Sequence, residues 1–470
     1  MHTYPIYCAG QFIQTNDELK VLNPFSGEIV ARTFRAGKDQ LEAAILKAQE
    51  VKEQMKNLPS WKRCEILKTI ADALLMDKER LASILAMESA KPLMHARTEI
   101  ERAAQTFFIA AEESKRLPKE YLSLDWTTAG TGKEGIVKYF PAGLVAGIAP
   151  FNFPMNLAVH KIAPAIAAGC PIILKPASST PLSTLELAKI IDATDLPKGA
   201  VAVLPMDRKA GNQLVTDERF ALLSFTGSPE VGWEMKSNAG RKKVVLELGG
   251  NAGTIITPTA DLQHAVNRAV AGGFSYSGQV CIHAQRFIVH RSVFAAFTEA
   301  FVDRVKKLKQ GNPLEHDTEL SSMIDEENAT RVENWVNEAV AAGARLLCGG
   351  KRNGTFYEAT VLTNTKAEMK VCCEEVFGPV VTVEVYDDFD EAIRYINNTR
   401  FGLQAGIFTH DQREIDQAFD QIEAGGVIVN DVPTFRVDHM PYGGVKDSGS
   451  GREGVRYAIL DMMEPKILVK

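Results

Sequence analysis

Three residues of this chain combine a reactive side chain with neighbours that suit acyl transfer. Cys281 ends the segment SYSGQVC, after helical sequence and two glycines, where backbone dipoles can stabilise a thiolate. Asn152, in APFNFP, follows an apolar strand, and its amide can donate a hydrogen bond to a developing oxyanion. Glu247, in VVLELGG, ends another apolar strand, a shielded position that suits a water-activating base. The three side chains could serve as nucleophile, oxyanion donor and base.

Each of these residues also has a purely structural explanation. An isolated cysteine is most often a small buried hydrophobe. An asparagine after a strand often bonds its own backbone in a turn, and a glutamate at a strand end can form a salt bridge. We expect the remaining cysteines to be structural: Cys8, Cys64, Cys170, Cys348, Cys372 and Cys373.

Two stretches match the glycine pattern GxGxxG of dinucleotide-binding loops. They span residues 130–135 and 449–454. A functional loop of this kind follows a strand and opens a helix, because the helix amino end binds the phosphates. Neither stretch is predicted to have that setting, so we expect neither to bind a cofactor.

The segment SFTGSPEVG is a better candidate for binding a dinucleotide. We expect Phe225 to close a strand, and Gly227, Ser228 and Gly232 to open a helix whose amino end can receive a pyrophosphate. Lys175, in ILKPAS, also ends a predicted strand. We expect it to contact the adenosine ribose, although it could instead be a solvated loop lysine.

Alternating strands and helices must position these residues. Five short apolar runs separated by helix-like segments predict a doubly wound parallel α/β sheet: GLVAGIA, IILK, AVAVLP, ALLSFTG and VVLELGG. Such sheets bind ligands beyond the carboxyl ends of their strands. Amphipathic helices are expected over residues 41–116, before the sheet.

A second α/β series begins near Asn251. Helices are predicted over residues 262–273 and 293–308, with strands at RFIVH, VVTVEVY, AGIFT and GGVIVN. Residues 119–140 have the pattern of a β-hairpin. The final PKILVK is expected to pair with this hairpin or with a neighbouring subunit.

Size and composition exclude several classes of protein. A chain of 470 residues exceeds the usual size of one core, so two or more domains are expected. The net charge of -6 provides no field that favours nucleic acid or a membrane surface. The apolar residues 143–174 are interrupted by polar residues and prolines, which indicates buried core. Seven cysteines without metal-ligand spacing, and no secretory signal, predict a cytoplasmic protein without a metal site.

The motifs taken together resemble one known family. APFNFP, ILKPAS, FTGS, ELGG, GQVC, EEVFGP and GGVK, in this order over nearly the full chain, are similar to the aldehyde dehydrogenase superfamily. The resemblance implies a dinucleotide-binding domain (residues 1–118 and 141–247) and an α/β catalytic domain (248–446). It also implies an oligomerisation arm with a C-terminal tail (119–140 and 447–470). Because an exposed hairpin needs a partner edge, a homodimer or homotetramer is expected.

The resemblance also assigns roles to residues. Cys281 would attack the aldehyde, Asn152 and the Cys281 amide would hold the oxyanion, and Glu247 would activate the water that hydrolyses a thioester. NAD or NADP is the implied cofactor, with Glu375 at the nicotinamide ribose. The expected cleft residues are Pro150, Lys175, Ser178, Phe225, Gly227, Ser228, Leu248, Glu375 and Phe377.

Ser178 departs from the pattern of many NAD-preferring members, which have glutamate at this place. A carboxylate there would repel a 2′-phosphate, and serine removes that repulsion. We therefore hypothesise that NADP is accepted or preferred.

Three segments, NDVPTFRVDHMPYGGVKDSG, MKNLPSWKR and NLAVHKIAP, look most like those of lactaldehyde and phosphonoacetaldehyde dehydrogenases, which act on small hydroxy- or acid-bearing aldehydes. Basic residues that could meet an anionic end group are Arg102, His160, Arg436 and His439. Each could instead be structural; Arg102, for example, could belong to a charged helix face.

Four alternatives fit the sequence less well. One is a succinate semialdehyde-type dehydrogenase. Another is a coenzyme A-acylating member, but these typically lack the glutamate that is present here as Glu247. A third is a non-catalytic structural or binding protein of the same fold. The fourth is a cysteine hydrolase with His283 as the partner of Cys281.

Overall fold

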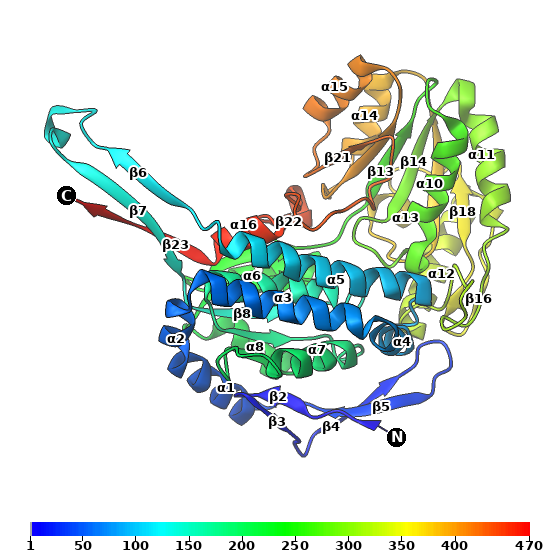
Figure 1. Ribbon diagram of the computed structural model, residues 1–470. Helices are drawn as coiled ribbons and strands as arrows, with labels where there is room; N and C mark the ends of the chain where they lie inside the picture. The colour runs from blue at the N-terminus through cyan, green and yellow to red at the C-terminus, as the bar shows by residue number, and fades with distance from the viewer. Residues whose placement is uncertain (1) are drawn as a thin grey trace.

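The five apolar runs form the parallel centre of an eight-stranded sheet. The computed structural model describes residues 2–470 (Figure 1). The strand order is β22-β12-β11-β8-β9-β10-β2-β3, and the strands from β12 to β10 run parallel. Their bounds are Leu144–Ile148 (β8), Ile172–Lys175 (β9), Val201–Val203 (β10), Phe220–Thr226 (β11) and Lys243–Glu247 (β12). The edges are antiparallel: β2 (Ile6–Cys8), β3 (Gln11–Ile13) and β22 (Gly449–Ser450).

Helices pack on both faces of this sheet, so the predicted doubly wound architecture is confirmed. Alternate strand residues point to opposite faces: Val145 joins one core cluster, and Leu144 joins the other. The first cluster contains α3 (Ser60–Met76), α4 (Lys78–Ser89), α5 (Leu93–Ser114), α6 (Asn156–Ala168), α7 (Leu182–Asp192) and α16 (Val455–Asp461). The second contains α1 (Lys38–Glu50), α8 (Arg208–Thr216) and α9 (Pro229–Asn238). The short α2 (Lys52–Asn57) links α1 to α3.

The second α/β series forms a separate seven-stranded sheet, in the order β15-β18-β19-β14-β13-β20-β21. All its pairs are parallel except β15 with β18. Its strands are β13 (Ala252–Ile256), β14 (Ala284–His290), β15 (Arg345–Cys348), β18 (Thr360–Thr363), β19 (Val380–Tyr386), β20 (Ala405–Phe408) and β21 (Val427–Val429). Its helices are α10 (Leu262–Phe274), α11 (Arg291–Val305), α12 (Glu326–Ala341), α13 (Lys370–Cys373), α14 (Phe389–Asn397) and α15 (Gln412–Gln421). The predicted helix over 293–308 is shifted: it begins at Arg291 and ends at Val305.

The predicted hairpin projects from the body of the molecule as an arm (Figure 1). It consists of β6 (Lys119–Ser123) and β7 (Glu134–Pro141), paired antiparallel. The last strand, β23 (Met463–Val469), pairs along the other edge of β7. Of the two partners considered for the C-terminal strand, the structure shows the hairpin of the same chain.

Two features differ from the sequence prediction. A small sheet of β1 (His2–Thr3), β5 (Ile29–Phe34) and β4 (Glu18–Leu22) lies near the N-terminus and was not predicted. The glycine stretch 449–454 opens a helix, α16, contrary to our expectation, but it does not follow a strand, because β22 is formed by its own first two residues. This strand has only two residues. It pairs with β12, where the chain returns to the edge of the first sheet.

The apolar stretch 143–174 forms β8, α6 and β9 in the middle of the first core. All 13 residues of α6 are buried. Within residues 2–470, no helix combines the length and apolar character needed to cross a membrane.

Candidate active site

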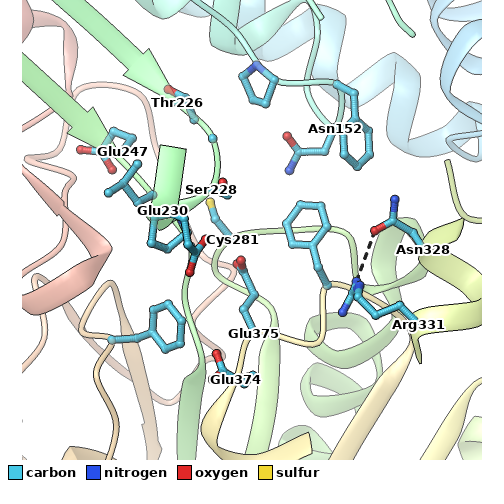
Figure 2. Close-up of a pocket in the computed structure, with 18 of the residues that line it drawn as sticks. Asn152, Thr226, Ser228, Glu230, Glu247, Cys281, Asn328, Arg331, Glu374 and Glu375 are labelled. Carbon is cyan, nitrogen blue, oxygen red and sulfur yellow. Dashed lines mark hydrogen bonds between the residues drawn. The ribbon is translucent and has the colours of Figure 1, made fainter. Parts of the chain in front are cut away.

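Three neighbouring strands end at one cavity and bring the proposed catalytic residues together. Strands β12, β11 and β8 lie side by side, so their carboxyl ends meet at one edge of the sheet. Glu247 ends β12, Thr226 ends β11, and Asn152 lies shortly after β8. Cys281 enters from the second sheet, just before β14. All four line a cavity of about 410 Å³ (Figure 2).

Cys281 is held on a sharply turned segment. Tyr276 and Ser277 have φ values of 48° and 54°, and Gly278 has 67°. Burial raises the pKa of the Cys281 thiol to about 11, and its hydrogen bond with the Tyr442 hydroxyl opposes that rise. The thiol is therefore protonated at neutral pH and must lose its proton before it can attack a carbonyl.

Asn152 points toward the segment that carries Cys281. Its Nδ2 donates a hydrogen bond to the Gln279 backbone oxygen at 2.9 Å. The following helix, α6, is anchored by buried Glu99, which accepts hydrogen bonds from the backbone nitrogens of Met155 (3.0 Å) and Asn156 (3.1 Å). The amide of Asn152 is thus fixed before any substrate arrives, as an oxyanion donor must be.

Glu247 is buried without a hydrogen-bond partner for either carboxylate oxygen within residues 2–470. Burial and the nearby negative charge of Glu453 raise its pKa well above the usual range. Burial would also raise the pKa of Glu453, but the charges of Lys161 and Arg436 lower it to about 2. The two acids therefore differ: Glu453 is ionised at neutral pH, and Glu247 holds its proton more tightly than an ordinary carboxyl group.

The other side of the cavity has the features of a dinucleotide site. Six of the predicted cleft residues line it: Pro150, Gly227, Ser228, Leu248, Glu375 and Phe377. Ser228 precedes α9, and its side chain does not cap the helix, so the amino end of α9 is open to a ligand. Phe225 lies beneath this turn: a Cβ on Gly227 would be 2.4 Å from its ring.

Glu375 lies against a glycine that allows close approach. A Cβ on Gly249 would be 2.3 Å from Glu375 Oε2, and Glu375 Oε1 accepts a hydrogen bond from the Gly250 nitrogen at 2.8 Å. Burial raises the pKa of Glu375 to about 8. A carboxyl group in this position fits a ribose hydroxyl.

Lys175 and Ser178 do not line this cavity. Lys175 lies against α8, where a Cβ on Gly211 would be 3.0 Å from its side chain. Ser178 Oγ donates to the Met206 backbone oxygen at 3.4 Å. Both residues therefore lie near the start of α8, away from Cys281.

The basic residues considered for the substrate form a network of ion pairs. His160 Nε2 lies 2.8 Å from Asp438 Oδ1, and Arg102 Nη2 lies 2.7 Å from the same oxygen. Arg436 Nη2 lies 3.0 Å from Glu453 Oε2 and 3.5 Å from His160 Nε2. His439 is exposed on the same loop. None of the four basic residues is among those lining the cavity in the described chain.

Sequence reasoning missed several residues of the site. Tyr442, in PYGG, contacts Cys281 Sγ at 3.2 Å. Asn328, Arg331 and Trp335 line the cavity from one face of α12. Their i, i+3, i+7 spacing on a helix was a usable signal. No local pattern links Arg436 to its partners, since Glu453 lies 17 residues away and His160 lies 276 residues away. His283 Nε2 donates a hydrogen bond to the Gly273 backbone oxygen at 2.9 Å, so this nitrogen is not a partner of Cys281.

Comparison with known proteins agrees with the motifs. A model of the aldehyde dehydrogenase family matches residues 12–468. The chain is 43% identical to a 3-sulfolactaldehyde dehydrogenase of Priestia aryabhattai over 468 residues, which cover 99% of this chain and 98% of the relative.

Two solved structures are similar over almost the whole chain. Aldehyde dehydrogenase 21 from Physcomitrella patens, in complex with the reaction product succinate, has a TM-score of 0.98 and 46% identity, covering 100% of this chain and 98% of that one. A glyceraldehyde-3-phosphate dehydrogenase from Methanocaldococcus jannaschii, complexed with NADP, has a TM-score of 0.93 and 39% identity, covering 97% and 100%. Motifs, fold and relatives agree that the chain belongs to the aldehyde dehydrogenase family, as an oxidoreductase that uses NAD or NADP.

Proposed function

We propose that this enzyme oxidises a small hydroxy- or anion-bearing aldehyde to the carboxylate, through a thioester on Cys281. The observation that carries this proposal is the common cavity of Cys281, Asn152 and Glu247, which continues into a cleft suited to a dinucleotide. The name of the 3-sulfolactaldehyde dehydrogenase relative supports the substrate class, because its substrate carries both a hydroxyl and a sulfonate.

Each catalytic side chain has one task. The Cys281 sulfur attacks the aldehyde carbon, and the carbonyl electron pair moves to oxygen, where Asn152 Nδ2 and the Cys281 amide receive the charge. NAD or NADP, which Ser228 and Glu375 would help to hold, would supply the hydride acceptor that oxidation of the hemithioacetal to a thioester requires. The Glu247 carboxylate then takes a proton from water, the water oxygen attacks the thioester carbon, and the thiolate leaves.

Glu247 favours transfer of the acyl group to water over transfer to a thiol. Its unpartnered carboxylate faces the cavity that holds Cys281, as a water-activating base requires. We therefore propose that coenzyme A does not stimulate turnover. Coenzyme A-dependent release of an acyl thioester would replace this proposal with the acylating alternative.

Among the four basic candidates, we propose that Arg102 meets the anionic end of the substrate. Its side chain is 26% exposed, whereas that of Arg436 is 6% exposed. Arg102 donates to Asp438 through Nε and Nη2, which leaves Nη1 without a partner on that carboxylate. Succinate in the complex of the moss relative supports an anionic substrate end. His160, Arg436 and His439 would then lie near this contact.

Three further proposals concern the cofactor, the oligomeric state and the location in the cell. NADP use is supported by Ser178 and by the NADP complex of one structural neighbour. A homodimer or homotetramer is supported by the exposed side chains Tyr121 and Trp126 on the arm. A cytoplasmic location is supported by seven free cysteines. The division into dinucleotide-binding, catalytic and oligomerisation parts remains a prediction.

A substrate panel tests the reaction and its substrate class. We expect reduced cofactor to form from 3-sulfolactaldehyde, succinate semialdehyde or lactaldehyde, measured with both NAD and NADP. Cys281→Ala should abolish this activity, and Cys348→Ala in the half-buried strand β15 is the matched cysteine control. Persistent oxidation by Cys281→Ala would exclude the thioester route.

The anion contact has its own test. Arg102→Met should raise KM for an anionic aldehyde about 10- to 100-fold, the value of a hydrogen bond to a charged group, with a neutral aldehyde little affected. Arg116→Met, which replaces an exposed arginine just beyond the same helix, is the control. An equal loss with neutral and anionic aldehydes would remove Arg102 from the substrate site.

A further inference from the structure

We propose that Tyr442 is a catalytic residue: its hydroxyl donates a hydrogen bond to the Cys281 sulfur and stabilises the thiolate that attacks the aldehyde. This inference rests on the proposed role of Cys281 as nucleophile. The hydroxyl oxygen and Sγ are 3.2 Å apart, within hydrogen-bonding range for sulfur. Tyr442 thus touches the reacting atom itself.

The hydroxyl has no other evident purpose in its surroundings. The Tyr442 ring is 2% exposed, in an apolar cluster with Tyr276, Val280 and Leu403. Phenylalanine would fill the same space, and a buried hydroxyl costs free energy unless it forms a hydrogen bond. Within residues 2–470, the Cys281 sulfur is the only hydrogen-bond partner recorded for this oxygen.

The direction of the bond follows from the protonation states. Burial raises the pKa of the Tyr442 phenol well above its usual value, so the phenol keeps its proton throughout the working pH range. When the thiol proton leaves, the sulfur has only lone pairs to offer. The phenol must then be the donor, and a hydrogen bond to a charged acceptor is roughly twice as strong as a neutral one.

Two further contacts hold the hydroxyl in place. Tyr442 and Glu453 form an isolated antiparallel bridge, in which the Tyr442 nitrogen donates to the Glu453 oxygen at 3.0 Å. The Arg436 guanidinium carbon lies 3.6 Å from the centre of the Tyr442 ring. A cation on the ring face draws electron density from the phenol and makes its O–H a better donor. Arg436, bound to Glu453, therefore acts as a positioning residue for Tyr442.

In the attack itself, charge leaves the sulfur. The thiolate electron pair forms the carbon–sulfur bond, and the carbonyl pair moves to the oxygen held by Asn152. The bond from Tyr442 is strongest before this step and weakens after it. It therefore increases the population of thiolate, at the expense of some intrinsic nucleophilicity.

The test compares Tyr442→Phe with the wild-type full-length protein. Cys281 is alkylated with iodoacetamide between pH 7 and 12, without aldehyde or cofactor, and the modified peptide is quantified by mass spectrometry. The sulfur displaces iodide, and the thiol proton passes to the buffer. We expect the pH profile of alkylation to move about one unit upward. The rate at neutral pH should fall about three- to tenfold, since the smaller population of thiolate is partly offset by its higher nucleophilicity.

Two matched variants sharpen the test. Tyr276→Phe removes a hydroxyl from the same cluster, but that hydroxyl donates to the Ser89 oxygen at 3.0 Å, so the profile should match the wild type. Replacing Tyr442 with 3-fluorotyrosine, a stronger hydrogen-bond donor, should move the profile downward. Identical profiles for Tyr442→Phe and wild type, or an equal shift in Tyr276→Phe, would overturn the proposal.

Failure of the proposed function would look different. If Cys281→Ala still oxidised aldehydes, the thioester route would be lost, but the alkylation profiles would still report on the bond between Tyr442 and the sulfur. Circular dichroism and thermal melting of Tyr442→Phe confirm that the fold is retained. With the fold intact, kcat/KM should fall about three- to tenfold at neutral pH and recover as the pH rises.

Discussion

Asn152 Nδ2 and the Gln279 backbone oxygen form a 2.9 Å hydrogen bond that joins the two sheets at the cavity. One partner follows β8 of the first sheet, and the other lies on the turn that carries Cys281. The bond fixes the proposed oxyanion donor against the segment that carries the proposed nucleophile, although the two segments adjoin different sheets.

Asn152→Ala should therefore lower kcat about 10²- to 10³-fold, the usual loss for one oxyanion donor. KM should change little, because the donor acts on charge that develops in the transition state. Steady-state kinetics with a saturating cofactor measure both values. A rise in KM with unchanged kcat would show that Asn152 binds the ground state instead.

Glu247→Gln should separate the two covalent stages. The amide fills the same space but cannot accept a proton from water, so hydrolysis of the thioester should slow about 10²- to 10⁴-fold. Rapid mixing should then show a burst of reduced cofactor equal to the enzyme concentration, followed by slow turnover. Absence of a burst would place the role of Glu247 before thioester formation.

The pH dependence should follow the interaction between Glu247 and Glu453. A base must be deprotonated, so activity should rise with pH through the raised pKa of Glu247. Glu453→Gln removes the negative charge that raises this pKa and leaves the charges of Lys161 and Arg436, which lower it. The acidic limb of the kcat profile should therefore move to lower pH, and a shift upward would contradict this account.

Ser178→Glu should discriminate against NADP. A carboxylate near the start of α8 would repel a 2′-phosphate, and we expect kcat/KM with NADP to fall at least tenfold while the value with NAD is retained. Ser178→Ala is the control, because it removes the hydroxyl without adding charge. Equal losses with both cofactors would mean that residue 178 lies outside the 2′-phosphate site.

Lys91→Met should test the buried ion pair behind the oxyanion donor. Lys91 bonds to Glu99, both side chains are inaccessible to solvent, and the Lys91 Nζ lies 3.7 Å from the centre of the Phe153 ring. Removing one partner leaves Glu99 unpaired, so the free energy of unfolding should fall by about 3–5 kcal/mol. Lys91→Met combined with Glu99→Gln should recover part of the loss in denaturant melts. A neutral single variant would show that the pair contributes no stability.

Much of the fold could be predicted from the sequence. The five apolar runs of the first sheet and the hairpin of the arm were predicted, because burial on both faces leaves short continuous apolar strands. The small N-terminal sheet was missed. Its strands are short. In addition, β1 pairs with β5, a segment far along the chain, and the local sequence pattern does not specify such a pairing.

The sequence by itself determined the reaction class, because the motifs of Cys281, Asn152 and Glu247 occur with four others in one order along the chain. What only the tertiary structure decided is which charges face each other. Asp438 lies beside His160, and Tyr442 lies beside Cys281, across more than 150 residues of chain. Glu453 lies beside Arg436 across 17 residues. Electrostatic effects fall off with distance in space and not along the chain, so the protonation states of this site follow from the folded arrangement alone.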